Sequence, residues 1–278
     1  MNKLYVIGNP IRHSKSPAIH NYWIKNYSLN AIYNKLEVRV EEISTLLDQV
    51  RNGTIKGLNI TIPFKKAVIP YLDELESSAK RSKAVNTVFR RGNNVVGANT
   101  DGTGFLKSIT EDLKVSLKQN FNVFCLGSGG AAYGIISELA NQNPKTVWVS
   151  NRTINKAKEL VQHFREIYPN TQFNIIPWGG SPRNLHNIFI NTTSIGMNKN
   201  DRVHLHLDNL PLDSLVYDII YNPPRTVIMK MAEQRNLKNV NGSFMLIRQA
   251  AAAFKKWFGI ELNSDDIHGA LKILNENA

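Results

Sequence analysis

The chain has 278 residues, of which 42% are hydrophobic and 20% charged, and its net charge is +12. The length suits two domains of ordinary size, and no apolar run reaches the roughly 18 residues of a membrane span. A single cysteine, Cys125, excludes a disulfide framework, and the short start Met1-Asn2-Lys3 indicates a cytoplasmic protein without a signal peptide.

The positive charge does not indicate a nucleic-acid-binding protein. Residues 1–101 contain 15 Lys and Arg against 8 Asp and Glu, and residues 102–241 contain 15 against 10, so the excess is dispersed. The densest basic segments, 80–83 and 90–91, lack the interleaved aromatic residues that stack on bases. We therefore expect no nucleic-acid partner. Broad positive charge would instead help to attract a phosphorylated cofactor and a small acidic substrate.

The first predicted strand, residues 4–7, leads into a polar loop that contains Ser14 and Ser16. Ser16 precedes Pro17 and suits the N-cap of a helix that begins there. Alternatively, both hydroxyls bind a polar anionic substrate, because they follow the carboxyl end of a strand, where α/β sheets place their ligands. This segment by itself favours the structural role.

A strand at residues 31–36 and an amphipathic helix at 40–50 precede a third strand, which ends at Pro63. Asn59 and Thr61 project from the same side of that strand. Lys65 follows directly and stands beside another lysine. The local sequence alone favours a solvated surface lysine at this position.

Residues 84–89 and 95–97, joined by a basic turn, predict a hairpin that contains Asn86. The chain then runs into Asp101 and a helix over about residues 103–113. Asp101 suits the N-cap of this helix, and it also suits the role of carboxylate partner to Lys65. The two roles can coexist.

Residues 121–149 predict a strand, a glycine turn, a helix and a second strand. The turn contains the dinucleotide fingerprint Gly-x-Gly-x-x-Ala, in which Gly127 permits the tight turn and Gly129 lets a pyrophosphate approach the backbone. The N–H groups of the next helical turn would face the phosphates. A glycine triplet alone is equally typical of a plain turn, but the flanking pattern favours a cofactor site.

The end of the second of these strands predicts which dinucleotide binds. NAD sites usually place an acidic residue there, whereas this chain has Asn151, Arg152 and Thr153, with Lys156 one helical turn later. Arg152 suits a bidentate contact with a 2′-phosphate, helped by Lys156 or Thr153, so we expect NADP(H). The alternative is a helix capped by Thr153 and followed by solvated basic residues.

The later segments complete a doubly wound Rossmann domain. Strand candidates at 173–176, 188–190, 215–219 and 238–240 alternate with helices at 155–167 and 227–235. Thr192 lies in a polar run after one of these strands, where it either contacts the nicotinamide half of the cofactor or forms a polar turn.

A last predicted helix, residues 243–258, follows Gly242 and is capped by Ser243. It carries Met245 and Gln249 on one face. His204 and His206 have the spacing of a metal pair, but no third ligand is nearby, so we expect a loop and no metal.

Taken together, these segments resemble shikimate dehydrogenase in order and spacing over the whole chain. The matching segments are Ser14-Lys15-Ser16-Pro17, Asn59-Ile60-Thr61-Ile62-Pro63-Phe64-Lys65, Ala84-Val85-Asn86-Thr87, Asn99-Thr100-Asp101-Gly102, the glycine turn at 127–132, Asn151-Arg152-Thr153, and residues 191–197, 218–226 and 242–250. One departure is Ser82-Lys83, where many members have an aliphatic residue and glycine.

The resemblance implies NADPH-dependent reduction of 3-dehydroshikimate to shikimate, a step of aromatic amino acid biosynthesis. Lys65 and Asp101 would form the catalytic pair. The implied substrate site comprises Ser14, Ser16, Asn59, Thr61, Asn86, Tyr221 and Gln249. The expected cofactor site comprises Gly127, Ser128, Gly129, Gly130, Ala131, Asn151, Arg152, Thr153, Lys156, Thr192, Gly242 and Met245.

The expected architecture is a two-domain α/β enzyme. Residues 1–101 plus 242–278 form a substrate-binding domain with a mainly parallel sheet, and residues 102–241 form the NADP-binding Rossmann domain. Two alternatives stay open, namely a relative that also uses quinate and a cofactor-sensing protein without catalysis. The sequence does not fix the oligomeric state, and a homodimer stays open.

Overall fold

The computed structural model describes residues 1–117, 119–182, 187–198 and 201–276. The chain forms two compact units. The first consists of residues 1–107 together with the chain from Leu246 onward, and the second of residues 108–245. Both boundaries fall inside helical segments, a few residues after the predicted ones. The functions that the sequence assigns to the two parts stay predictions.

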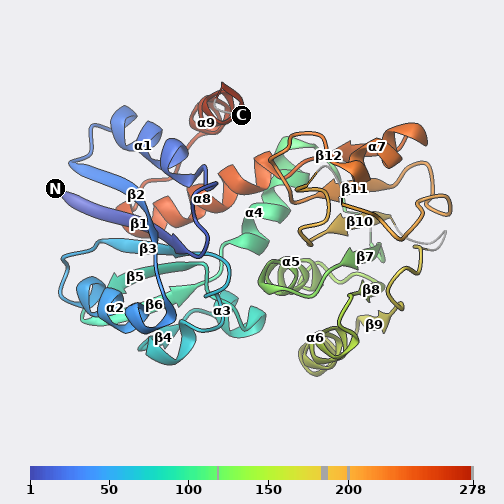
Figure 1. Ribbon diagram of the computed structural model, residues 1–278, viewed down its shortest axis with the longest axis horizontal. Coiled ribbons are helices and arrows are strands. Elements are labelled where there is room, and N and C mark those ends of the chain that lie inside the picture. The colour runs from blue at the N-terminus through green and yellow to red at the C-terminus, as the bar shows by residue number, and fades with distance from the viewer. Residues whose placement is uncertain (118, 183–186, 199–200, 277–278) are drawn as a thin grey trace. The chain divides into compact units, whose positions relative to one another are not determined.

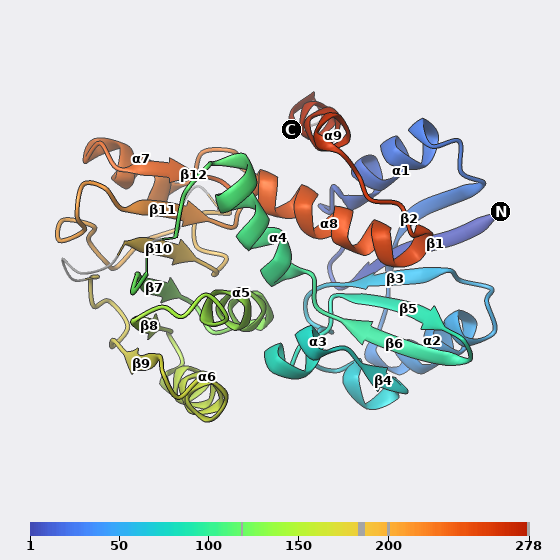
Figure 2. The ribbon, with the colours of Figure 1, turned by 180° about the vertical axis from the view of Figure 1, so that it is seen from behind.

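The first unit is built on a six-stranded, mainly parallel sheet with the order β2-β1-β3-β5-β6-β4 (Figure 1). Strands β1, β2 and β3 run parallel, as do β4 and β6, whereas β5 is antiparallel to both β3 and β6 (Figure 2). The strands are β1 (Asn2–Gly8), β2 (Ala31–Glu37), β3 (Gly57–Ile60), β4 (Glu74–Leu75), β5 (Thr87–Arg91) and β6 (Asn94–Ala98).

Helices cover both faces of this sheet. They are α1 (Ser16–Asn26), α2 (Ile43–Arg51), α3 (Ser77–Ser82), α4 (Asp101–Lys107), α8 (Ser243–Phe258) and α9 (Ser264–Glu276), with short 3₁₀ turns η1 (Val40–Glu42) and η2 (Ile69–Tyr71). The predicted helix over 40–50 is thus observed as η1 followed by α2. Strand β4 and helices α3 and α9 were not predicted from the sequence.

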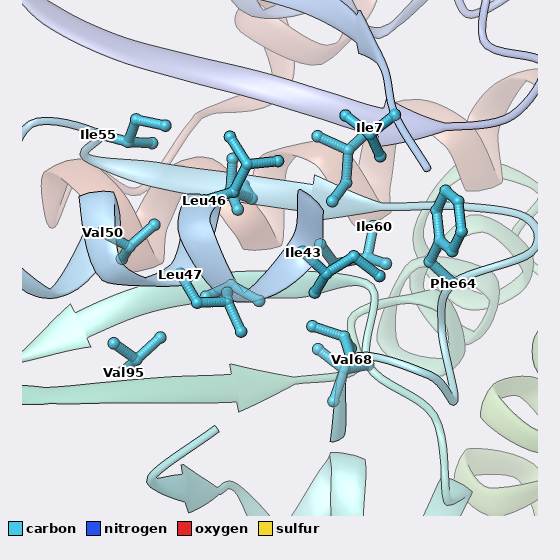
Figure 3. Packing of buried hydrophobic residues seen from close by; sticks show 14 of the residues in the cluster. Ile7, Ile43, Leu46, Leu47, Val50, Ile55, Ile60, Phe64, Val68 and Val95 are labelled. Carbon is cyan, nitrogen blue, oxygen red and sulfur yellow. The ribbon is translucent and has the colours of Figure 1, made fainter. Parts of the chain in front are cut away.

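Alternation along β3 separates an apolar core from a polar site. Leu58 and Ile60 belong to a buried cluster with Ile43, Leu47 and Val50 of α2 (Figure 3). The intervening Asn59 must face the other side of the sheet, because successive side chains of a strand alternate. Packing of the apolar face of α2 on Leu58 and Ile60 therefore fixes the direction in which Asn59 points, toward the polar side of the sheet.

Three residues that were predicted as N-caps are instead the first residue of their helices, namely Ser16, Asp101 and Ser243. In each case the N–H of this residue donates to a side chain two positions earlier, as in Asx and Ser/Thr turns. The accepting atoms are Ser14 Oγ at 3.4 Å, Asn99 Oδ1 at 3.0 Å and Asn241 Oδ1 at 3.1 Å. The side chains of Ser16 and Asp101 are thereby left for other contacts.

Helix α9, which was not predicted, starts with a capping box. The N–H of Asp266 donates to Asn263 Oδ1, and the N–H of Asn263 donates to Asp266 Oδ2, both at 3.0 Å. Asp266 also accepts from the Tyr27 hydroxyl and, through its carbonyl, from Trp23 Nε1. These contacts hold α9 against α1.

The second unit has a six-stranded, fully parallel sheet with the order β12-β11-β10-β7-β8-β9. This is the strand order of the doubly wound Rossmann fold, as expected. The elements are the π-helical η3 (Ser108–Asp112), β7 (Asn122–Leu126), α5 (Gly130–Ala140), β8 (Thr146–Ser150), α6 (Ile154–Ile167), β9 (Gln172–Ile175), β10 (Ile188–Asn191), β11 (Leu215–Asp218), α7 (Val227–Gln234) and β12 (Lys238–Val240).

The strand order reverses between β7 and β10, and such a switch point is where open α/β sheets bind ligands. The glycine turn follows β7, and Thr192 follows β10. Within the described ranges, no helix is both long and apolar enough to cross a membrane. The cytoplasmic location stays a prediction.

Candidate active site

Lys65 and Asp101 meet in the first unit. The distance between Lys65 Nζ and Asp101 Oδ2 is 2.5 Å, and the two side chains are 15% and 8% exposed. Two contacts fix this geometry, because Val85 N–H donates to the Lys65 carbonyl and Asn99 Oδ1 accepts from the Asp101 N–H. The surface interpretation of Lys65, which the local sequence favours, is therefore wrong.

Asn86 connects this pair to the rest of the site. Its amide Nδ2 lies 2.8 Å from Asp101 Oδ1, 2.9 Å from Thr100 Oγ1 and 3.3 Å from Gln249 Oε1. Its Oδ1 accepts from the Thr100 N–H at 2.8 Å and from the Thr87 hydroxyl at 2.9 Å. Asn86 is only 3% exposed. Hydrogen bonds to both Nδ2 and Oδ1 therefore fix the orientation of the Asn86 amide, and both polar atoms have partners, as is usual for buried polar groups.

Gln249 reaches Asn86 because α8 packs closely on α4. A Cβ at Gly104 of α4 would lie 2.6 Å from the backbone nitrogen of Gln249, so no larger residue fits there. Gln249 Nε2 donates to the Leu246 carbonyl of its own helix at 2.8 Å. This bond directs Oε1 of Gln249 toward Asn86.

Asn59 and Ser16 form a second part of the same network through Tyr33. The Tyr33 hydroxyl donates to Asn59 Oδ1 at 2.6 Å, and Ser16 is also hydrogen-bonded to it. Asn59 Nδ2 donates to the Asn86 carbonyl at 3.0 Å and to Thr87 Oγ1 at 3.3 Å. Burial raises the pKa of Tyr33 well above its ordinary value, so the hydroxyl keeps its proton.

The remaining predicted substrate residues have fewer contacts. Thr61 is half-buried just after β3, where its N–H donates to the Ile7 carbonyl. Ser14 is half-buried in the loop before α1. Tyr221 is half-buried after β11 and belongs to the second unit. The structure thus connects Lys65, Asp101, Asn86, Gln249, Asn59 and Ser16 by hydrogen bonds within one unit.

Three residues of this network were not singled out from the sequence, namely Tyr33, Thr87 and Thr100. Thr87 and Thr100 stand beside Asn86 and Asp101 in two of the matching segments, so their position was a usable signal. Tyr33 gave none, because an aromatic residue in a buried strand is ordinarily core. Its role as a hydrogen-bond donor depends on pairing between distant strands.

The glycine turn of the second unit has room for a ligand. Gly127 has a φ of +109°, and a Cβ there would lie 2.3 Å from Thr192 Oγ1, so only glycine fits. A Cβ at Gly129 would have no neighbour within 4 Å among the described residues. Gly129 precedes the first turn of α5, whose N–H groups suit an anion.

Ser128 supplies a polar atom that is suited to a ligand. It is 5% exposed, and within the part of the chain that the structure describes its hydroxyl has no hydrogen-bond partner. A buried polar group without a partner costs free energy. Together with the open space at Gly129, this hydroxyl fits a phosphate group of a dinucleotide.

The basic segment after β8 is accessible. Arg152, Thr153 and Lys156 are exposed, and Asn151 Nδ2 donates to the Thr153 carbonyl at 2.9 Å. Thr153 occupies the N-cap position of α6, but its side chain makes no capping hydrogen bond. Only the position of Thr153 therefore agrees with the helix-capping alternative. The side chains of Arg152 and Lys156 place two exposed cationic groups near the carboxyl end of β8.

The residues expected near the nicotinamide lie on firmly packed segments. Thr192 Oγ1 donates to the Leu126 carbonyl at 2.8 Å, which ties it to the start of the glycine turn. Gly242 is buried, and a Cβ there would lie 2.0 Å from the Ile219 carbonyl oxygen. Met245 is 7% exposed. Their contact with a cofactor stays a prediction.

Asp218 organises the loop after β10, and the sequence did not single it out. It is fully buried and accepts from Asn191 Nδ2 at 3.0 Å, from Thr226 Oγ1 at 2.7 Å and from the Ile220 N–H at 3.1 Å. Asn191 Oδ1 in turn accepts from the N–H and the hydroxyl of Thr193. Burial raises the pKa of Asp218 to about 6, although these hydrogen bonds oppose the change.

The two histidines with metal-pair spacing lie in an irregular segment. His204 and His206 are both exposed, and the His206 N–H donates to Ser181 Oγ. No group of three or more His, Cys, Asp or Glu side chains suited to a metal occurs among the described residues.

Comparison with known proteins gives one consistent family. Residues 6–88 match the family described as the shikimate dehydrogenase substrate binding domain, and residues 108–178 match the family described as shikimate / quinate 5-dehydrogenase. The shikimate dehydrogenase (NADP(+)) of Pelagibacter ubique strain HTCC1062 is 42% identical over 265 residues, which cover 95% of this chain and 96% of that protein.

Solved structures agree with the sequence comparison. A crystal structure of shikimate dehydrogenase in complex with NADP+ is 33% identical with a TM-score of 0.87, covering 98% of this chain and 95% of that one. The shikimate 5-dehydrogenase of Thermus thermophilus in complex with NADP(H) and shikimate is 28% identical with a TM-score of 0.86, covering 99% and 100% of the two chains.

Proposed function

Because this chain belongs to the shikimate dehydrogenase family, we propose that it reversibly reduces 3-dehydroshikimate to shikimate with NADPH. The observation that carries the proposal is the contact between Lys65 and Asp101, which places an ammonium group and a carboxylate 2.5 Å apart with both side chains largely buried. Such a pair outside the hydrophobic core is a candidate for chemistry rather than for stability alone.

The network around the pair suits a small polyhydroxylated acid. Asp101, Asn86 and Gln249 present carboxylate and amide groups to ring hydroxyls, and Asn59 and Thr61 add further polar groups. Ser14 and Ser16 would bind the substrate carboxylate with neutral hydroxyls, which avoids burying another charge. Tyr221 is assigned to the same substrate from the family resemblance.

Reduction of the ketone needs a proton at the oxygen that becomes the alcohol. Hydride addition to the carbonyl carbon leaves negative charge on this oxygen, and a positioned general acid accelerates such a step by about 10²- to 10⁴-fold. Lys65 would stabilise the charge and transfer the proton from Nζ. Asp101 would hold the ammonium group in place and accept a hydrogen bond from a neighbouring substrate hydroxyl. In the oxidative direction, Lys65 accepts the proton back.

The second unit would hold NADP(H), which when bound supplies or accepts the hydride. Gly127, Gly129 and the N–H groups of Gly130 and Ala131 would surround the pyrophosphate, with Ser128 Oγ donating to it. Further contacts would come from Asn151, Arg152, Thr153 and Lys156 at the 2′-phosphate, and from Thr192, Gly242 and Met245 near the nicotinamide. The Ser128 hydroxyl, which has no partner among the described residues, and the open space at Gly129 support this assignment.

An initial-rate assay that follows NADPH absorbance tests the proposal. The purified protein is given shikimate or quinate, each with NADP+ or NAD+. We expect shikimate with NADP+ to give by far the largest kcat/KM. Absence of turnover with shikimate and either cofactor would overturn the proposal.

The same assay separates the two alternatives. A quinate-using relative gives comparable kcat/KM for both acids, and the name of the family that matches residues 108–178 includes quinate. A cofactor-sensing protein binds NADPH without turning over either acid. The close Lys65–Asp101 contact argues against such a protein, because cofactor sensing alone needs no buried acid–base pair.

A further inference from the structure

Tyr33 lies beneath the substrate network, and its position is fixed by packing. It is on β2, its side chain is fully buried, and its ring stacks on His20 with 4.2 Å between centroids and 14° between planes. Trp257 of α8 packs on another side at 6.0 Å. Burial lowers the pKa of His20 to about 3, so this stacking partner stays uncharged at physiological pH.

The backbone of Tyr33 is fixed as well. Asn21 of α1 accepts from the Tyr33 N–H at 2.9 Å and donates to its carbonyl at 2.8 Å. Both polar groups of this edge-strand residue are therefore bonded to α1. With backbone and ring restrained, the hydroxyl can occupy only a small volume, and this volume adjoins Asn59 and Ser16.

The hydrogen bonds of the Tyr33 hydroxyl determine how the Asn59 side chain is oriented. A phenol has one hydrogen to donate, and here it goes to Asn59 Oδ1 at 2.6 Å. The phenol oxygen is then an acceptor for Ser16. Since Oδ1 of Asn59 faces Tyr33, its amide Nδ2 must face the Asn86 carbonyl and Thr87 Oγ1. The side-chain amide of Asn59 could in principle be rotated so that Oδ1 and Nδ2 exchange places. By donating to Oδ1, the Tyr33 hydroxyl stabilises the observed orientation.

We propose that Tyr33 is a positioning residue that fixes the Asn59 amide and the Ser16 hydroxyl in the arrangement that binds substrate. The inference rests on the proposed function, because it takes Asn59 and Ser16 as substrate contacts. Tyr33 acts through these two side chains and takes no part in the proton or hydride transfer. Its loss should therefore weaken substrate binding more than turnover.

The test is Tyr33→Phe, which removes only the hydroxyl and keeps the stacked ring. Loss of one or two neutral hydrogen bonds to substrate-binding groups should raise the KM for shikimate by about 5- to 20-fold. We expect kcat and the KM for NADP+ to change by less than about twofold. Calorimetric titration with shikimate should show the same loss of affinity.

Tyr27→Phe is the matched control. Its hydroxyl also makes one hydrogen bond, to Asp266 Oδ2 at 2.7 Å, but at the contact between α1 and α9. This variant should leave the KM for shikimate unchanged. If Tyr33→Phe instead behaved like Tyr27→Phe, with a lower Tm and an unaltered KM, Tyr33 would be merely structural and the inference wrong.

A double-mutant cycle with Asn59→Ala sharpens the test. If Tyr33 acts through Asn59, adding Tyr33→Phe to Asn59→Ala should raise the KM further by much less than it does in the wild-type background. Full additivity would overturn the inference. Failure of the proposed function can be distinguished from failure of the inference about Tyr33. If the proposed function is wrong, the wild-type protein itself neither binds nor oxidises shikimate.

Discussion

The two proposed binding regions differ in how their polar groups are satisfied. In the first unit, Lys65, Asp101, Asn86 and Asn59 are hydrogen-bonded to one another. In the second unit, the buried Ser128 hydroxyl has no partner among the described residues. The first region is therefore held in shape by its own side chains, whereas the second offers open donors to a ligand. Substitutions in the first region should affect stability together with turnover, and those in the second mainly affinity.

Among the substitutions that compare the two regions, Asp101→Asn should have the largest effect, because it breaks the central pair of the first region. The Lys65 ammonium group would lose its anionic partner while 15% exposed, so kcat should fall by about 10²-fold or more. The free energy of unfolding should fall by roughly 2 to 4 kcal/mol. Steady-state kinetics and urea unfolding measure the two effects.

Asp73→Asn is the control for this change. Asp73 pairs with Arg51 at 3.1 Å in the same unit, but its side chain is 35% exposed and lies outside the network. Its loss should leave kcat unchanged and cost less than about 1 kcal/mol of stability. Equal effects of the two substitutions on kcat would contradict the special role of Asp101.

Arg152→Ala tests the open region. Removal of a guanidinium that binds a 2′-phosphate should raise the KM for NADP+ by about 10- to 100-fold, since hydrogen bonds to charged groups are among the strongest. The KM for NAD+ and the Tm should hardly change, because Arg152 is exposed. Lys158→Ala, at an exposed residue of the following helix α6, is the matched control. A proportional loss for both cofactors would refute the assignment.

Asp218 is an exception to this difference between the two regions, because it is a buried carboxylate of the second unit whose oxygens both accept hydrogen bonds. Its folded-state pKa is raised from 3.8 to about 6, so the folded protein binds its proton more tightly than the unfolded chain does. The resulting contribution of Asp218 to the free energy of unfolding is fully present below about pH 4 and is lost as the pH rises through about 6.

The expected loss of stability from this group over that window is roughly 2 kcal/mol. Asp218→Asn should remove this part of the pH dependence, which chemical unfolding of both proteins between pH 4 and 7 would measure. An unchanged difference between the two proteins across this range would show that Asp218 titrates normally.

The smallest expected effect concerns Lys83, which precedes Asn86 in a segment where many family members have glycine. Lys83 is exposed and has a φ of +44°, in the left-handed region that glycine adopts most readily. Lys83→Gly should raise the free energy of unfolding by up to about 1 kcal/mol without changing kcat. A loss of stability would mean that the lysine side chain contributes more than the backbone strain costs.

The sequence predicted most of what local patterns determine. Strand and helix periodicity located the Rossmann unit, and the glycine turn of Gly127 and Gly129 lies at its switch point. The pairing of Lys65 with Asp101 was one of two roles that the sequence offered for Asp101, and the family resemblance favoured it. The local sequence could not, because 35 residues separate the two and the surroundings of Lys65 suggest an exposed lysine.

Other features depend on tertiary packing and left no local signal. Tyr33 donates to Asn59 only because β1 pairs with both β2 and β3 in the observed registers. Asp218 likewise joins β10 to α7 through Asn191 and Thr226. Helix α9 is different, since its capping box at Asn263 and Asp266 was visible in the sequence.

The most direct test of the proposed chemistry is the rate of NADPH oxidation by Lys65→Ala with 3-dehydroshikimate, measured with and without added methylamine. We expect turnover to fall by about 10²- to 10⁴-fold, NADPH to bind normally, and the small amine to restore part of the rate. The neighbouring Lys66 provides the control Lys66→Ala, which should be as active as the wild type. Near-normal turnover by Lys65→Ala would contradict the account.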